Sequence, residues 1–365
     1  MKKPTFKTYA IYGLVVILFI SSLIFINNNH HLYSKTIAEI TSTKITETQQ
    51  VEDTYNNLDT LYTQRMTAVI KNGEREGEEI EILNQYSSTG AVDTQYKVGN
   101  ELFVTVSEDA TTIEGVKRDT YNILVAWVFI FILLLVGRKQ GFLSLISLVI
   151  NALILSYAID LYLKNTENSL VLICGISVVL FTVISLLLVN GRNEKTYAAI
   201  VATLLGTFSS LFITYLALVA TGEQGLRYEE MQFLTVPYQT VFLAGLFIGS
   251  LGAVMDVAIT MSSSLFMLYE KKPSITVKEL KDSGLSIGTD IMGTMTNILF
   301  FAYVCGSIPM LIIYLMSGSP LGFTLTMNLS LELARALAGG IGIVLTIPLG
   351  LFTSIYFINK KRSRA

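Results

Sequence analysis

Two aspartates stand in similar strings within otherwise apolar sequence, where a carboxyl group could carry a proton or bind a cation. From Asp256 the chain reads DVAITMSSSLF, and from Asp290 it reads DIMGTMTNILF. Aspartate, threonine, methionine, leucine and phenylalanine recur at the same positions of both strings. The match predicts two related helices that each present one carboxyl group.

Helical spacing places each aspartate on a narrow polar face, because residues three or four apart share one side of a helix. The first face holds Gly245, Gly249, Gly252, Asp256, Thr260, Ser263 and Ser264, and the second holds Ser283, Ser286, Asp290, Thr294 and Asn297. An ionised aspartate at the bilayer centre costs about 2.5–3.5 kcal/mol. Both faces should therefore meet each other or water rather than lipid, while the three glycines allow close helix packing.

The composition requires a membrane to hold these helices. Of 365 residues, 52% are hydrophobic and only 15% are charged, and apolar runs of about 18 or more residues recur, as in membrane-spanning helices. The sequence predicts a polytopic α-helical membrane protein with about eight transmembrane helices. The expected spans are residues 8–27, 121–136, 142–163, 169–189, 197–221, 239–268, 287–316 and 333–358. Whether residues 239–269 cross once or form a re-entrant pair is open at this point.

The segment between the first two spans has a different character. Residues 29–118 contain 8 lysines and arginines against 15 aspartates and glutamates. Strand signals include 66–71, which ends at the turn pair Asn72-Gly73, the alternation around Ile80 and Ile82, and the run 102–106. We expect a small β-rich domain here, with a helix across residues 45–62. The resulting division is an anchor helix at 1–28, this domain at 29–118 and a seven-helix membrane domain at 119–365.

The distribution of basic residues predicts the orientation. Fifteen of the 26 lysines and arginines lie in residues 1–9, 137–141, 191–195, 270–285 and 359–365, which alternate spans would place on one side. Because short cytoplasmic loops are rich in lysine and arginine, both termini are expected in the cytoplasm and residues 29–118 outside it. The first apolar run is long and no small-residue cleavage site follows it, so it is expected to remain as an anchor.

Several kinds of chemistry lack the residues they need. The histidines are His30 and His31, just after the first span, so the predicted membrane helices contain no imidazole. Cys174 and Cys305 lie in apolar runs without metal-ligand spacing. The serines 262–264 have no candidate base for a hydrolase. We expect no cofactor, no metal site and no nucleic-acid partner, because the basic residues follow the predicted topology.

Two further features lie around the aspartate strings. The basic segment 270–282 connects them, and Ser274 or Thr276 could cap a short interfacial helix there. In the last span, Arg335 is a possible charge partner of Asp256. The alternative is that Arg335 pairs with Glu332, three residues earlier on the same helix.

The strings GAVMDVAITMSSSL at 252–265 and SIGTDIMGTMTNILFFAY at 286–303 resemble signatures of the YibE/F family of bacterial membrane proteins. The resemblance extends over most of residues 60–358 and includes the YKVGN string of the outer domain. It implies a multispanning protein of the bacterial cell membrane. It implies no particular substrate.

Three classes of function fit these observations. The first is a gradient-coupled transporter or exporter of a small solute or ion, with Asp256 and Asp290 as coupling groups and with Thr260, Ser263, Ser264, Thr294 and Asn297 along the path. The second is an assembly or sensing protein whose outer domain binds a partner protein. The third is an intramembrane aspartyl protease, although Thr289 replaces the glycine expected before the second aspartate and a tyrosine is missing before the first. Only the third would be an enzyme.

Overall fold

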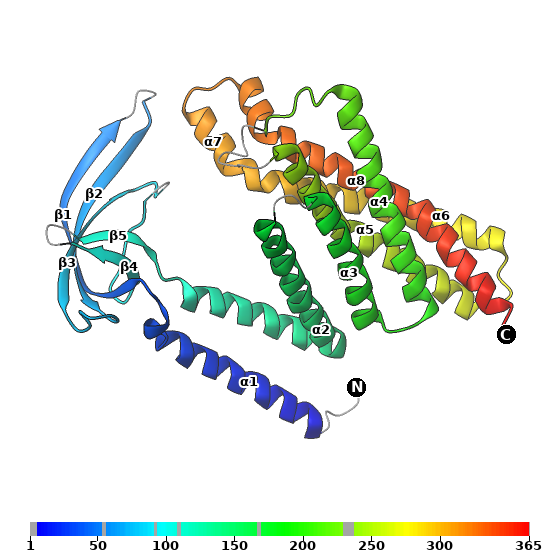
Figure 1. The fold of residues 1–365 in the computed structure, drawn as a ribbon, viewed down its shortest axis with the longest axis horizontal. Coiled ribbons are helices and arrows are strands. Elements are labelled where there is room, and N and C mark those ends of the chain that lie inside the picture. The colour runs from blue at the N-terminus through cyan, green and yellow to red at the C-terminus, as the bar shows by residue number, and fades with distance from the viewer. Residues whose placement is uncertain are drawn as a thin grey trace. The chain divides into compact units, whose positions relative to one another are not determined.

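The computed structural model describes residues 6–52, 56–90, 93–107, 111–165, 169–228 and 237–364, with side chains from residue 13 onward. The chain divides into two compact units, Met1–Val136 and Gly137–Ala365. The first contains a β-sheet and two helical segments, and the second is helical (Figure 1).

The first unit is built around a five-stranded antiparallel sheet. Helix α1, Phe6–Asn27, and a single 3-10 turn, His30–Leu32, precede the sheet. The strands are β1, Thr36–Glu52; β2, Leu58–Ile70; β3, Glu79–Ser87; β4, Glu101–Val106; and β5, Thr111–Val116. Their order is β3-β2-β1-β4-β5.

Alternating side chains form the core of this sheet, as the period of a β-strand requires. Ile80 and Ile82 are buried, whereas Glu79 and Glu81 are exposed. Ile80 and Ile82 join a cluster contributed by four strands: Ala38, Ile40, Met66, Ala68, Ile70, Leu102 and Val104. The predicted β-rich domain is confirmed, and its expected strands at 66–71, 80–82 and 102–106 fall in β2, β3 and β4. Gly73 turns the chain after β2 with φ +87°.

The helix expected across residues 45–62 is wrong. Residues 45–52 belong to β1 and residues 58–62 to β2, and these strands pair from Ala38↔Ile70 to Glu52↔Leu58. Threonine occurs at residues 46, 48, 54 and 60, and isoleucine and valine at residues 45 and 51, and β-branched residues favour extended backbone. The charged and amide side chains are compatible with strands because residues 41–50 are exposed.

Helix α2 begins at Asp119, and its first part packs against α1 within the first unit. The indole nitrogen of Trp127 donates to the Ser22 hydroxyl at 2.8 Å, and the Phe19 and Trp127 rings meet edge to face at 5.6 Å. Helix α2 extends to Lys164 but contains a break at Arg138, where φ is 49° and ψ is −123°. The two spans expected at 121–136 and 142–163 therefore lie on either side of this residue.

The second unit contains the rest of α2 and the remaining helices. These are α3, Leu170–Asn190; α4, Glu194–Thr221; α5, Tyr238–Lys271; α6, Val277–Val304; α7, Ile308–Met316; and α8, Leu321–Arg362. In the described part of the chain, six helical segments are long and apolar enough to cross a membrane, with α6 and α7 counted together. Helix α1 is also apolar over Gly13–Asn27.

The two aspartate strings lie on α5 and α6. Helix α5 is continuous, so residues 239–269 form one helix rather than a re-entrant pair. Thr276 caps α6 in a capping box with Glu279, as predicted. Helix α6 then continues without forming a separate interfacial helix. It ends before a 3-10 turn at Cys305–Ser307, where Pro309 cannot donate a backbone hydrogen bond to the preceding turn.

Helix α8 is packed closely by its neighbours through small residues. Gly339 lies against Leu299 of α6, and Gly342 lies against Val254 of α5 and Ser210 of α4. The Ser210 hydroxyl donates to the Ala338 carbonyl at 2.6 Å. Small residues bring helix backbones close enough for such contacts, so α4, α5 and α6 have well-defined positions around α8.

Candidate functional site

The polar face predicted on α5 is present and open. Gly245, Gly249, Gly252 and Asp256 are exposed, and Thr260 is half-buried further along the same face. Ser263 and Ser264 are also half-buried. The opposite face carries the core residues Val257, Met261 and Leu265. The helix is thus positioned by its apolar side and leaves the small, polar side uncovered.

Helix α6 is arranged in the same way. Asp290, Thr294 and Asn297 are exposed, whereas Gly284 and Gly288 are buried against Leu351 and Ile347 of α8. Together these open sides of α5 and α6 form what we call the carboxyl face: Gly245, Gly249, Gly252, Asp256, Thr260, Ser263, Ser264, Asp290, Thr294 and Asn297.

The two halves of the carboxyl face lie on helices that contact each other. At one level, Tyr303 of α6 places its hydroxyl over Gly249 of α5. At another, the Leu265 side chain packs against Gly284. Between these levels, no atom lies within 4 Å of the Cβ position of Gly252 or Gly293. The halves are neighbours, but both are open rather than closed onto each other.

This exposure has an energetic consequence. The 18-residue apolar window within Val277–Met316 has mean hydropathy 2.2, and that within α5 has 2.0. Ionised carboxylates on such helices cost about 2.5–3.5 kcal/mol each when they face lipid at the bilayer centre. The carboxyl face therefore requires water, a bound cation or a polar partner against it.

Two ion pairs on α8 and α2 lie outside the carboxyl face. The Arg335 guanidinium pairs with Glu332, as in the alternative to a pairing with Asp256. It also lies 5.4 Å from the centre of the Phe242 ring. Asp160 pairs with Lys164 at 2.7 Å. No group of three or more histidine, cysteine, aspartate or glutamate side chains in the described residues is placed to hold a metal ion.

A pocket of about 530 Å³ adjoins one end of the α5 polar face. Ser263 lines it together with side chains from the start of α4, the end of α5 and the end of α8: Asn193, Glu194, Lys195, Phe266, Met267, Glu270 and Lys361. Lys361 lies 3.8 Å from Glu270. Sequence reasoning missed this pocket because its residues come from three separated segments.

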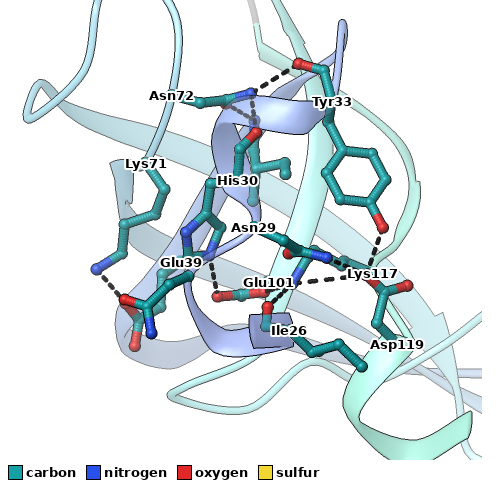
Figure 2. Close-up of polar contacts among 12 residues, drawn as sticks. Ile26, Asn29, His30, Tyr33, Glu39, Lys71, Asn72, Glu101, Lys117 and Asp119 are labelled. Carbon is teal, nitrogen blue, oxygen red and sulfur yellow. Dashed lines mark hydrogen bonds and ion pairs between the residues drawn. The ribbon is translucent and has the colours of Figure 1, made fainter. Parts of the chain in front are cut away.

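A second polar cluster lies in the first unit, where the sheet meets the ends of α1 and α2 (Figure 2). Its centre is Lys117, whose side chain is 1% exposed. The Lys117 ammonium contacts Glu101 at 2.6 Å and Asp119 at 3.7 Å. It also donates to the carbonyl of Ile26 in the last turn of α1 at 3.2 Å. One ammonium thus joins α1, β4 and α2.

Hydrogen bonds hold the chain between α1 and β1 against this centre. His30 Nε2 lies 2.6 Å from Glu101, and the Tyr33 hydroxyl donates to Asp119. Asn72 donates to the carbonyls of His30, Tyr33 and Lys35 at 3.0–3.2 Å and accepts from the Ile37 amide at 2.7 Å. We call His30, Tyr33, Asn72, Glu101, Lys117 and Asp119 the junction cluster.

The electrostatics of the junction cluster follow from these contacts. Burial raises the pKa of the Glu101 carboxyl, but Lys117 and His30 lower it more, so the pKa lies below its usual value. The hydrogen bond to Asp119, together with burial, raises the pKa of the Tyr33 hydroxyl. Sequence reasoning missed this cluster. The sequence did contain one indication of it, because Lys117 is a basic residue of an acidic domain and stands just before a predicted span.

Comparisons with known proteins agree with this two-part architecture. Residues 31–117 match the YibE/F family N-terminal domain, and residues 125–360 match the family described as YibE/F-like protein. No curated protein and no solved structure matches the chain. The second match covers more than half of the chain and contains the carboxyl face, while the first contains most of the junction cluster. The chain is an integral membrane protein that belongs to the YibE/F-like family.

Proposed function

We propose that this protein is a gradient-coupled transporter or exporter of a small solute or ion, and that Asp256 and Asp290 are its coupling groups. The observation that carries the proposal is the carboxyl face, in which two aspartates lie on the open sides of contacting, apolar helices. Intramembrane acidic residues on ion or proton pathways have this character.

The proposed topology has eight membrane crossings in a bacterial cell membrane. Helix α1 is the first, the two parts of α2 on either side of Arg138 are the second and third, and α6 with α7 counts as one. With both termini in the cytoplasm, the sheet lies on the outer side. The concentration of lysine and arginine in the short loops supports this orientation.

The side chains of the carboxyl face suit protons and small hard cations. An aspartate can gain and lose a proton, and carboxylate, hydroxyl and amide oxygens are the ligands that such cations prefer. Thr260, Thr294 and Asn297 supply oxygens on the same faces as the two aspartates. The pocket at Ser263 continues the α5 polar face towards the proposed cytoplasmic side.

Proton movement across reconstituted vesicles tests the proposal. A pH-sensitive dye inside the vesicles reports proton flux after a pH or sodium gradient is imposed. Asp256→Asn and Asp290→Asn should each slow this flux at least about tenfold. Asp282→Asn is the matched control, because Asp282 is exposed near the start of α6, before the apolar run. Full flux in both aspartate variants would overturn the proposal.

A sensing or assembly role is the second candidate, and the β1–β2 pair favours it. Beyond Ile40, residues 41–50 of β1 are exposed while still paired with β2. This polar arm could bind a partner protein. Shortening the arm on both strands should abolish a sensing function while leaving proton flux in vesicles unchanged.

A further inference from the structure

The junction cluster has a charge imbalance that one histidine can correct. Two carboxylates, Glu101 and Asp119, lie against one ammonium, that of Lys117. The cluster therefore carries one excess negative charge while His30 is neutral. His30 is bonded to Glu101 on the side opposite Lys117 (Figure 2), so a proton on its ring would make the formal charges equal.

His30 is also accessible to protons from solution. It lines a pocket of about 390 Å³ together with His31, Lys35, Lys71, Asn72 and Glu76, among others. The His30 side chain is 16% exposed. The pocket therefore connects solvent to a residue that is hydrogen-bonded to the buried centre of the cluster.

The two lysines that line the His30 pocket, Lys35 and Lys71, each pair with a carboxylate other than Glu101. Lys71 of the β2–β3 loop pairs with Glu39 at 2.5 Å, and Lys35 pairs with Glu114 of β5 at 2.6 Å. Glu101 faces His30 from β4, and Lys117 and Asp119 lie behind Glu101 at the start of α2. Tyr33 remains a neutral donor to Asp119. His31 and Glu76 are in the pocket lining rather than in the cluster.

We propose that the junction cluster is a proton-responsive clasp, in which protonation of His30 tightens the hold of the β-sheet on the ends of α1 and α2. A histidine ordinarily changes charge between about pH 5 and 8. A neutral imidazole donates to the Glu101 carboxylate with only the acceptor charged, whereas protonation gives the donor a positive charge and turns the hydrogen bond into an ion pair. Acidification of the solution around the sheet therefore strengthens the His30–Glu101 bond, and alkaline conditions loosen it.

The single tryptophan reports this change directly. Trp127 of α2 donates a hydrogen bond to the Ser22 hydroxyl of α1. Ser22 lies one helical turn before Ile26, whose carbonyl accepts from Lys117. In the purified full-length protein, Trp127 emission should show a sigmoidal transition between about pH 5 and 8. His30→Gln should abolish it, because glutamine can donate to Glu101 but cannot be protonated. His31→Gln is the matched control and should retain it.

Two further measurements keep the proposal falsifiable if His30→Gln does not fold. Glu101→Gln removes the negative charge that a protonated His30 would pair with, so the emission transition should lie at lower pH in this variant than in the wild type. Amide exchange in residues 33–37, corrected for its intrinsic pH dependence, should be slower at pH 6 than at pH 8. A transition that persists in His30→Gln, or flat emission together with equal amide protection at both pH values, would overturn the proposal.

Discussion

At the scale of single residues, Lys117 shows how one buried charge can hold an interface between elements. Its partners are Glu101 on β4, Asp119 on α2 and the Ile26 carbonyl on α1. Removing one member of a buried ion pair leaves the others without compensation, which is far more costly than breaking an exposed pair.

Lys117→Met should therefore destabilise the first unit by about 3–5 kcal/mol, although methionine is apolar and of similar length. Lys35→Met is the matched control. The Lys35 side chain, which pairs with Glu114, is 61% exposed, and exposed ion pairs contribute about 0–1 kcal/mol to stability. Amide exchange of β4 and β5 in the purified protein measures both effects. Equal protection in the two variants would contradict this role of Lys117.

The pKa of Glu101 predicts a response to acid. The pKa of Glu101 in the folded protein is lower than the usual value. The Glu101 carboxylate therefore stabilises the fold above the unfolded-state pKa, and this contribution is lost as the pH falls through the folded-state pKa. The wild-type sheet should lose stability as the pH falls below about 4.5, the ordinary range of a glutamate, and Glu101→Gln should remove part of that loss. Circular dichroism during thermal unfolding at several pH values measures it. Glu79→Gln, on an exposed side chain of β3, should behave as wild type.

Single residues also show the limit of sequence reasoning. Helical spacing alone predicted that Asp256 shares one side of a helix with Gly245, Gly249 and Gly252, all of which are exposed on α5, because that grouping depends on residues within one helix. The sequence predicted that the two polar faces meet either each other or water. It could not predict that both faces are open, because this depends on which sides of α5 and α6 contact α8. Lys117 was missed because Ile26 and Glu101 are distant in sequence.

At the scale of helices, glycines distinguish the packed side of α6 from its open side. A Cβ atom on Gly288 would clash with the Ile347 side chain of α8, whereas Gly293 has no atom within 4 Å of the same position. Gly288→Val should therefore destabilise the second unit by about 1–3 kcal/mol through overpacking. Gly293→Val should leave thermal stability in detergent nearly unchanged. If both variants unfold at the same temperature, the assignment of the two faces is wrong.

The break in α2 is a second feature at this scale. Arg138 has φ 49° and ψ −123°, a backbone region that favours glycine. Arg138→Gly should stabilise the protein by about 1 kcal/mol, whereas Lys139→Gly, at an exposed and helical position, should destabilise it by about 1 kcal/mol. Thermal unfolding in detergent distinguishes the two signs. Destabilisation by Arg138→Gly would contradict the broken geometry.

The helices were easier to predict than the strands, for a physical reason. Long apolar runs must form helices in a bilayer because every backbone polar group needs an internal partner. The stretch 45–62 had no such constraint, and its polar composition hid the pairing of β1 with β2. The sheet order also depends on contacts between β1 and β4 that no local pattern specifies.

At the scale of the whole molecule, the protein combines two compact units with separate polar centres. The first unit contains the junction cluster, and the second contains the carboxyl face. Each centre contains two carboxyl groups, Glu101 and Asp119 in the first unit and Asp256 and Asp290 in the second, and both centres are proposed to respond to protons. In the proposed topology, a proton gradient across the membrane would act on the junction cluster from the outer solution and on the carboxyl face within the bilayer.

The most direct test is whether water reaches the carboxyl face within the membrane. Single cysteines at Gly252, Gly293 and Asn297, in a protein whose Cys174 and Cys305 are replaced by alanine, would be exposed to a charged thiol reagent in vesicles. Thiols react as thiolates, which form in water rather than in lipid. Ile298 and Phe301, exposed apolar positions of α6, are the matched controls. We predict rapid labelling of the first three and slow labelling of the controls, and equally slow labelling at all five positions would contradict a wet carboxyl face.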